Sequence, residues 1–262
     1  MKKTINNLAV YDFGNKRNPS IIFVHGFPYD HHMWHNQIEA LKDKYYCVAY
    51  DIRGFGESKI GDGQYTMEMF VDDLFTVIKK MKLSKPVLCG MSMGGYISLR
   101  AIERDQSIFK AVILCDTKAE ADTNDGKLKR AAAIKQINEN GAKKFVESFI
   151  KNCFSDITLE ENRKVYLDTL SRSKKSKTLG LKGALLAMAG RTDTTTNLPK
   201  INIPTLLIVG SFDTLTPPNV MREMTLKIKS SEFGIAPGAG HMAPLENPGF
   251  VNDMITGFLN NQ

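Results

Sequence analysis

A serine between glycines stands in the segment CGMSMGG at residues 89–95, with the pattern Gly90-x-Ser92-x-Gly94. An apolar run that resembles a buried strand precedes it, and GGYISLRAIERD, a plausible helix, follows it. A tight turn from strand to helix forces a serine into an unfavourable backbone conformation, exposes its hydroxyl and places helix N–H groups near a developing oxyanion. This five-residue pattern also occurs by chance, so other features of the sequence are needed to show whether Ser92 is a nucleophile.

A nucleophilic serine needs a base, and the base needs an acid that orients it. His241 lies in the Gly/Pro-rich segment PGAGHMAPLENP, a kind of loop that presents functional side chains. His25 ends a strand, and we expect it to shape the following loop. Asp213 directly follows a strong strand in GSFDTLTPP. The alternative interpretation of Asp213 is that it only forms a turn, as Asp often does. Asp116, which follows its own strand, is the other candidate for the acid. We favour His241 as the base and Asp213 as the acid.

Three further histidines, His31, His32 and His35, cluster in PYDHHMWHNQ with a spacing that could suggest a metal. No partnering carboxylate or cysteine pair is expected with them, so we predict no metal and interpret the segment as a loop that enters a helix. The cysteines have no metal-type spacing, and most lie in apolar strand-like runs. Free thiols of this kind are typical of a cytoplasmic protein. The four cysteines are Cys47, Cys89, Cys115 and Cys153.

The composition is that of a globular protein, with 42% hydrophobic and 24% charged residues. We expect no signal peptide and no membrane span, because no apolar run has the length that either needs. The net charge of +7 comes from residues 118–191, which hold 16 Lys and Arg against 9 Asp and Glu. The densest basic run, SRSKKSK at 171–177, has no interleaved aromatic residue. We therefore predict no nucleic-acid partner and interpret the charges as a solvated face that can attract anionic substrates.

Apolar runs that are typical of buried parallel strands alternate with helical patterns along much of the chain. Between two of them, Phe70, Leu74, Ile78 and Met81 recur at spacings of three and four and form one apolar helix face. The alternation predicts an α/β fold with a parallel sheet covered on both faces and ligands at the carboxyl ends of its strands. The strand-like runs are residues 20–26, 45–51, 86–92, 111–117 and 203–211, with 231–236 as a weaker sixth.

Consecutive helical patterns replace this alternation from residue 118 to residue 191. In AKKFVESFIKNCF, for example, Phe145, Phe149 and Cys153 fall on one side of a helix, and lysines fall largely on the other. The strand pattern then resumes at 203, so the chain returns to finish the same sheet. We predict a core of residues 1–117 and 192–262, with residues 118–191 as a helical cap over the strand ends.

The order Ser92, Asp213, His241 matches the order of catalytic residues in the α/β-hydrolase superfamily. HGFPYDHHMW at 25–34 resembles the oxyanion loop of that family, and YDIRGFGES at 50–58 resembles its D-x-R-G-x-G-x-S segment. The segments around Asp213 and His241 resemble the subgroup of 3-oxoadipate enol-lactonases and small carboxylesterases. The resemblance covers the chain from about residue 5 onward and implies a mostly parallel sheet with a cap inserted after the sixth strand.

The resemblance also implies roles for individual residues. The backbone N–H groups of Phe27 and Met93 would form the oxyanion hole, and Phe27 would also wall the substrate pocket. Trp34, Met91 and Met242 are further pocket candidates, with core packing as their structural alternative. No metal or organic cofactor is implied.

The expected activity is hydrolysis of a small carboxylic ester or lactone through an acyl-enzyme on Ser92. Serine at this position argues against haloalkane dehalogenases and epoxide hydrolases, which use Asp there. A cofactor-free haloperoxidase or perhydrolase, a C–C bond hydrolase, and a ligand receptor on a hydrolase scaffold remain as alternatives. The partner is thus a small molecule rather than a nucleic acid or a membrane, and no feature of the sequence indicates an oligomeric state.

Overall fold

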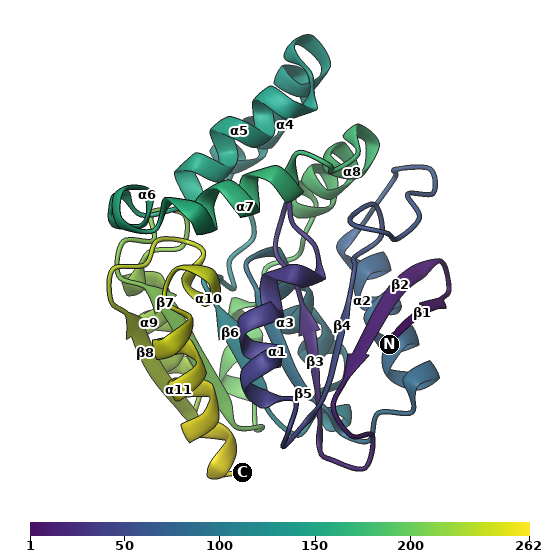
Figure 1. The fold of residues 1–262 in the computed structure, drawn as a ribbon, viewed down its shortest axis with the longest axis vertical. Coiled ribbons are helices and arrows are strands. Elements are labelled where there is room, and N and C mark those ends of the chain that lie inside the picture. The colour runs from purple at the N-terminus through teal and green to yellow at the C-terminus, as the bar shows by residue number, and fades with distance from the viewer.

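The computed structural model describes all 262 residues and contains one eight-stranded sheet (Figure 1). The strands are β1 (Lys2–Ile5), β2 (Leu8–Phe13), β3 (Ser20–Val24), β4 (Tyr46–Tyr50), β5 (Val87–Met91), β6 (Val112–Cys115), β7 (Thr205–Gly210) and β8 (Ser231–Ala236). Their spatial order is β1-β2-β4-β3-β5-β6-β7-β8. The strands from β4 to β8 in this order run parallel, while β1 and β2 pair antiparallel at one edge. The predicted mostly parallel α/β sheet is confirmed.

Helices cover both faces of this sheet, as the alternating pattern predicts (Figure 1). Helices α1 (His35–Leu41) and α11 (Pro248–Asn260) pack together on one face, and α2 (Met67–Met81) and α3 (Met93–Asp105) pack together on the other. Helix α9 (Pro218–Lys227) packs against β7 and β8. The apolar face of α2 is buried through Phe70, Leu74 and Ile78. The short elements are η1 (His31–Trp34), η2 (Gln106–Ile108), η3 (Thr195–Lys200) and α10 (Ala243–Glu246).

The hairpin of β1 and β2 is an addition that the strand patterns above did not predict. Its turn residues, Asn6 and Asn7, have φ values of 47° and 67°. Two successive positive φ angles define the tight turn that matches the twist of a two-stranded hairpin, and asparagine adopts this conformation more easily than most residues. The Asn-Asn pair is therefore the sequence signal that identifies the hairpin.

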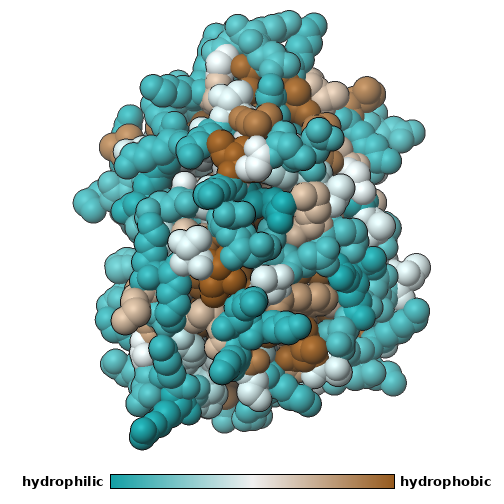
Figure 2. Space-filling view, turned by 90° about the vertical axis from the view of Figure 1, so that its right-hand side faces the viewer, coloured by the Kyte–Doolittle hydropathy of each residue, from teal (hydrophilic) through white to brown (hydrophobic).

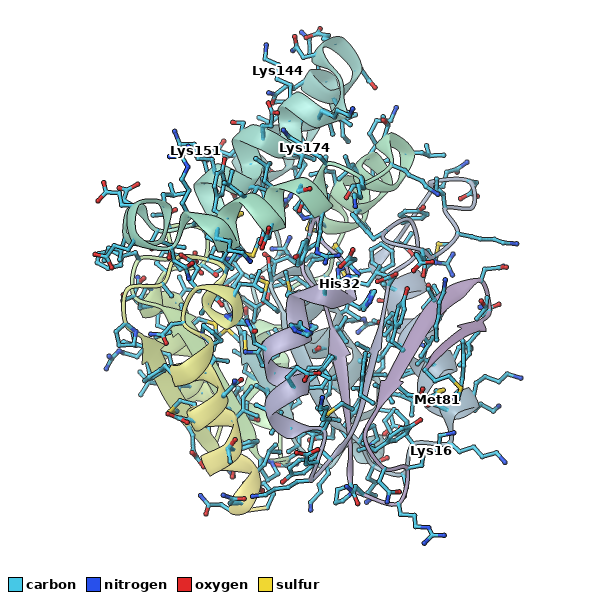
Figure 3. The ribbon with its side chains drawn as sticks, viewed as in Figure 1. Lys16, His32, Met81, Lys144, Lys151 and Lys174 are labelled. Atoms are coloured by element: carbon cyan, nitrogen blue, oxygen red, sulfur yellow. The ribbon has the colours of Figure 1, made fainter.

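Five consecutive helices connect β6 to β7 and lie above the sheet at the top of Figure 1. They are α4 (Asn124–Asn140), α5 (Ala142–Cys153), α6 (Asp156–Glu161), α7 (Arg163–Ser173) and α8 (Thr178–Ala189). Helix α8 is apolar and largely buried, whereas α4 buries only Ile137. Lys144 and Lys151 point away from these helices into solvent (Figure 3). We call residues 118–191 the cap and the remaining residues the core.

The surface of the protein is mostly hydrophilic on the face that Figure 2 shows, with hydrophobic side chains scattered over it. None of the helices has the length and apolar character that crossing a bilayer requires. All four cysteines are free and buried. Burial raises the pKa of the Cys47 thiol to about 12, and so disfavours the reactive thiolate.

Candidate active site

Ser92 lies between the end of β5 and the start of α3, in a strained turn. Its backbone has φ 52° and ψ −114°, in the positive-φ region that most residues avoid. Two glycines make this turn possible. A Cβ atom on Gly90 would collide with the carbonyl oxygen of Gly94, and one on Gly94 would collide with the carbonyl oxygen of Val24. The strained turn predicted from the Gly90-x-Ser92-x-Gly94 spacing is thus present.

Ser92, His241 and Asp213 form one chain of hydrogen bonds, although the serine and the histidine are 149 positions apart. The Ser92 hydroxyl oxygen is 2.8 Å from His241 Nε2. On the other side of the ring, His241 Nδ1 donates to Asp213 Oδ2 at 2.8 Å. The carboxylate holds the imidazole with its Nε2 lone pair directed at the hydroxyl, which is the arrangement that nucleophilic catalysis by serine requires.

Asp213 is held ionised in a buried position. Burial alone would raise its pKa, but the nearby charge of His241 and hydrogen bonds from His241 and Thr216 lower the pKa to about 2. The Thr216 hydroxyl donates to Oδ2 at 2.6 Å, and the backbone N–H groups of Leu215 and Thr216 donate to Oδ1 at 2.8 and 3.0 Å. Asp213 therefore presents a fixed negative charge to the imidazole at neutral pH.

Asp116, the rival acid, directly follows the neighbouring strand β6 but makes no hydrogen bond to the histidine ring. Its Oδ1 accepts a hydrogen bond from the Gly210 backbone at 2.8 Å, and its Oδ2 has no partner. Burial and the negative charge of Asp213 raise the pKa of Asp116 well above its usual value, which favours the neutral carboxyl. Of the two candidates, the structure brings only Asp213 to His241.

Glu246, which the sequence reasoning did not single out, fixes the loop that carries His241. Its Oε1 accepts hydrogen bonds from the backbone N–H groups of Gly240 and Met242, on either side of the histidine, at 2.9 and 3.0 Å. Its Oε2 accepts from the Ser155 backbone at 2.9 Å and from the Thr158 hydroxyl at 2.8 Å, both in the cap. One carboxylate thus joins the histidine loop to the cap. The available signal was an acidic residue five positions after the histidine, in PLENP.

The predicted oxyanion-hole residues lie on two segments beside Ser92. Phe27 follows β3, and its backbone N–H donates to no backbone acceptor. Met93 is the first residue of α3, where helical N–H groups have no partner within the helix. The loop of Phe27 is anchored by His25, whose Nδ1 donates to the Gly26 carbonyl and whose Nε2 accepts from the Ile52 N–H, both at 2.9 Å. Burial lowers the pKa of His25, which favours this neutral form.

A cavity of about 110 Å³ lies between the core and the cap at Ser92 and His241. Phe27, Phe149, Met188 and Leu215 form its apolar wall. The rings of Phe27 and Phe149 meet edge to face, with their centroids 5.3 Å apart. Its polar wall consists of Tyr96, Lys118 and Arg130. The space suits a small, partly apolar substrate.

Of the predicted pocket residues, only Phe27 lines this cavity. The prediction is wrong for Trp34, Met91 and Met242, which are at most 1% exposed and belong to the hydrophobic core. Trp34 packs against Phe23, with ring centroids 5.3 Å apart. These side chains are close in sequence to catalytic groups, but the backbone directs them into the core. Phe149, Met188 and the polar wall supply the contacts that the sequence reasoning did not identify.

The histidine cluster after Phe27 is accompanied by carboxylates, contrary to expectation. His31 Nδ1 donates to the buried Asp51 at 2.7 Å, and His32 Nδ1 donates to Asp30 at 2.9 Å. The ring of His31 also stacks on Tyr11 at a centroid distance of 3.6 Å. The potential ligand atoms of Asp30, His31 and His32 lie within 4.8 Å of one another. These bonds to carboxylates fix the turn η1 that precedes α1.

Comparison with known proteins agrees with this architecture. Residues 19–248 match the sequence profile of the alpha/beta hydrolase fold, and the chain belongs to this family. It is 29% identical over 252 residues to 3-oxoadipate enol-lactonase 1 of Acinetobacter baylyi, covering 96% of this chain and 92% of the relative. It is 27% identical to a non-heme chloroperoxidase of Kitasatospora aureofaciens, covering 95% and 94%.

Among solved structures, a thermophilic esterase from Thermogutta terrifontis with malate bound is 33% identical and has a TM-score of 0.94, with 100% of this chain and 98% of that one covered. The enol-lactonase from Burkholderia xenovorans shares the fold with a TM-score of 0.90 at 22% identity, over 99% of this chain and all of that chain. The resemblance to enol-lactonases and small esterases is confirmed, and the predicted class of enzyme, a carboxylic ester hydrolase, agrees with these relatives.

Proposed function

We propose that this protein is a serine hydrolase that cleaves small carboxylic esters or lactones through an acyl-enzyme on Ser92. The observation that carries the proposal is the continuous chain from Ser92 through His241 to Asp213, with both hydrogen bonds at 2.8 Å. Its relatives include an esterase and enol-lactonases, which supports ester or lactone bonds as the target.

In the first step, the Ser92 oxygen attacks the substrate carbonyl while its proton passes to His241 Nε2. The carbonyl oxygen becomes an oxyanion, which the N–H groups of Phe27 and Met93 stabilise, and each such donor contributes on the order of 10²- to 10³-fold in rate. The ionised carboxylate of Asp213 stabilises the positive imidazolium. His241 then gives the proton to the leaving alkoxide, the C–O bond breaks and the acyl group stays on Ser92.

In the second step, a water molecule gives a proton to His241 Nε2 and attacks the acyl-enzyme. The second tetrahedral intermediate collapses when the bond to Ser92 breaks and His241 returns the proton to the serine oxygen. The products are the carboxylic acid and the alcohol, or one hydroxy acid when the substrate is a lactone. The protein needs no metal or organic cofactor for these steps.

Within this function, residues 118–191 act as a lid over the core of residues 1–117 and 192–262. Phe149 and Met188 of the cap line the cavity together with Phe27 and Leu215 of the core. Apolar residues around a reacting carbonyl exclude bulk water and strengthen electrostatic interactions there. The lid therefore selects the substrate, while the core supplies the reacting groups.

A second activity, peracid formation, is favoured by one observation: the relatives include non-heme chloroperoxidases. The same acyl-enzyme would form, and hydrogen peroxide would replace water in the second step. Initial rates of hydrolysis and of peracid formation from one ester, with and without peroxide, compare the two activities. Hydrolysis alone would exclude this second candidate.

The direct test measures initial rates on 4-nitrophenyl acetate, butyrate, octanoate and laurate. We expect fastest turnover on acetate or butyrate because the cavity is small. Ser92→Ala should abolish turnover without unfolding the protein, whereas the exposed Ser107→Ala should behave like the wild type. If folded Ser92→Ala keeps its esterase activity, or if the wild type turns over none of the four esters, the proposed function is wrong.

A further inference from the structure

Lys118 is placed unusually for a cap lysine, because its side chain is half-buried and faces the same cavity as Ser92 and His241. Its Nζ makes no hydrogen bond or ion pair within the protein, whereas Arg130, the other cation that lines the cavity, pairs with Asp122 at 3.0 Å. Removing an ammonium group from water without a partner is costly. Lysines such as Lys144 and Lys151 avoid this cost by pointing into solvent (Figure 3).

Arg130 of α4 lines the cavity beside Lys118. Its Nε donates to Asp122 at 3.0 Å, and its two terminal nitrogens have no partner in the protein. Asp122 also accepts from Nη1 of the buried Arg191 at 2.7 Å, so one carboxylate serves two arginines. The guanidinium of Arg130 thus keeps donors that can reach a ligand in the geometry that suits a carboxylate.

The charged side chains that line the cavity include two cations, Lys118 and Arg130, and no carboxylate. The nearby carboxylate of Asp122 is shared between Arg130 and Arg191. Burial and the charge of Arg191 lower the pKa of Lys118, while Asp122 and Glu120 act in the opposite direction. An anionic group of a ligand in this cavity would therefore face two cations and no competing carboxylate in the lining. Arg191 also lies 4.2 Å from the ring centroid of Tyr96, which holds this wall in position.

We propose that Lys118 and Arg130 form an anion subsite that binds a carboxylate of the substrate inside the catalytic cavity. This proposal rests on the proposed function and narrows it to small esters or lactones that carry a second, free carboxylate. Because the cavity spans only about 110 Å³, the carboxylate lies a few atoms away from the carbonyl that Ser92 attacks. It belongs either to the acid part or to the alcohol part of the substrate.

The test compares kcat/KM for charged and neutral esters. In one arm, 4-nitrophenyl hydrogen glutarate carries the carboxylate in the acid part, and 4-nitrophenyl butyrate is its neutral reference. In the other, 4-acetoxybenzoate carries it in the alcohol part, with methyl 4-acetoxybenzoate as reference. Lys118→Met should lower the charged-to-neutral ratio about 10- to 100-fold in one arm, as expected for a hydrogen bond to a charged group. Lys118→Arg should restore most of the ratio.

Lys182→Met is the matched control, because Lys182 is a half-buried cap lysine outside the cavity whose Nζ donates to Asn138 at 3.0 Å. It removes the same net charge and should leave both ratios within twofold. If Lys118→Met changes neither ratio, or changes both no more than Lys182→Met does, the subsite proposal is overturned. Loss of long-range attraction alone would affect the two lysine variants equally.

Binding of glutarate to the folded Ser92→Ala protein separates the subsite from the reaction. Calorimetry should show at least tenfold weaker binding when Lys118→Met is added, and little change when Lys182→Met is added. If the wild type turns over no ester but glutarate binding depends on Lys118, the proposed function fails and the anion subsite stands. If esters are hydrolysed but glutarate does not bind, or binds without regard to Lys118, the subsite fails alone.

Discussion

On the core side of the catalytic cavity, Ser92, His241 and Asp213 are joined by hydrogen bonds of 2.8 Å, and Asp213 accepts three further hydrogen bonds from its own loop. On the cap side, the ring of Phe149 meets Phe27 edge to face, Arg130 is bound to the protein through Nε alone, and Lys118 has no protein partner. The core side is thus organised before a substrate arrives, whereas the cap side keeps interactions open for the substrate to complete.

This difference separates two requirements on one cavity. Reaction at the carbonyl depends on groups held in place, because a preorganised dipole need not reorient as charge develops. Discrimination between substrates depends on contacts that one substrate makes and another cannot make. Substitutions on the core side should therefore reduce kcat for every ester, and substitutions on the cap side should change the ratio between esters.

After the complete loss of turnover expected for Ser92→Ala, the largest effect is expected for Asp213→Asn. An amide at this position can hold the wrong imidazole tautomer and has no charge to stabilise the imidazolium, so kcat should fall about 10³- to 10⁴-fold. Steady-state kinetics with 4-nitrophenyl butyrate measure the loss.

Asp116→Asn provides a control of the same chemistry at the end of the neighbouring strand. Since the environment of Asp116 favours its neutral carboxyl and it makes no hydrogen bond to His241, kcat should stay within about threefold of the wild type. The assignment of the acid would be reversed if Asp116→Asn lost activity and Asp213→Asn kept it.

The core side could be predicted from the sequence because its residues stand at the ends of recognisable strands. Ser92 follows β5 and Asp213 follows β7, and the carboxyl ends of parallel strands meet at one edge of the sheet. The strained turn at Ser92 could also be predicted, because Gly90 and Gly94, which make it possible, are its near neighbours in the sequence. What the strand pattern could not supply was the four-way hydrogen bonding of Glu246, because its cap partners Ser155 and Thr158 are distant in sequence.

The lining of the cavity was harder to predict than the catalytic residues, because proximity in sequence does not decide which way a side chain points. Met91 is next to Ser92 and Met242 is next to His241, yet both are buried in the core. Arg130 lies on α4, whose only buried residue is Ile137. Because this helix has no repeating pattern of buried apolar residues, its sequence does not indicate which of its faces meets the cavity. The orientation of these residues follows from the packing of α4 against α5 and α8.

Glu246→Gln tests the connection between the two sides and should have the next largest effect. An amide nitrogen would replace one oxygen that accepts two hydrogen bonds, so two donors lose their acceptor whichever way the amide turns. We expect about tenfold lower kcat through displacement of His241, and about 2 kcal/mol lower stability, which corresponds to a Tm lower by about 4–8 °C. Scanning calorimetry and kinetics measure both, with the exposed Glu232→Gln as control. An unchanged kcat would show that the loop holds His241 without this carboxylate.

A smaller effect, confined to selectivity, is expected for Phe149→Ala. Removing this ring from its edge-to-face contact with Phe27 enlarges the cavity on the cap side. The ratio of kcat/KM for octanoate to that for butyrate should rise about fivefold, within the effect that a few methylenes have in an apolar pocket. The exposed Leu167→Ala should leave the ratio unchanged. Equal losses on all chain lengths would instead place Phe149 with the core side.

The smallest effect concerns stability at acid pH. The pKa of Asp213 is about 2 in the folded protein, below the value of about 3.9 for an aspartate in an unfolded chain. A depressed pKa contributes stability that is complete above the unfolded value and is lost as the pH falls toward the folded value. Between pH 6 and pH 3 the wild type should therefore lose about 1 kcal/mol more than Asp213→Asn, which cannot titrate there.

Urea unfolding of the two proteins at pH 6, 4 and 3 measures this difference. Asp12 also has a pKa of about 2, because bonds from Lys3, Tyr46 and the N-terminus outweigh its burial, but it is present in both proteins and cancels. If the two stability curves run parallel down to pH 3, the core side does not hold Asp213 as a preformed charge. Asp213 would then be ionised only when a substrate is bound. In that case the core side, like the cap side, would depend on the substrate to complete its interactions.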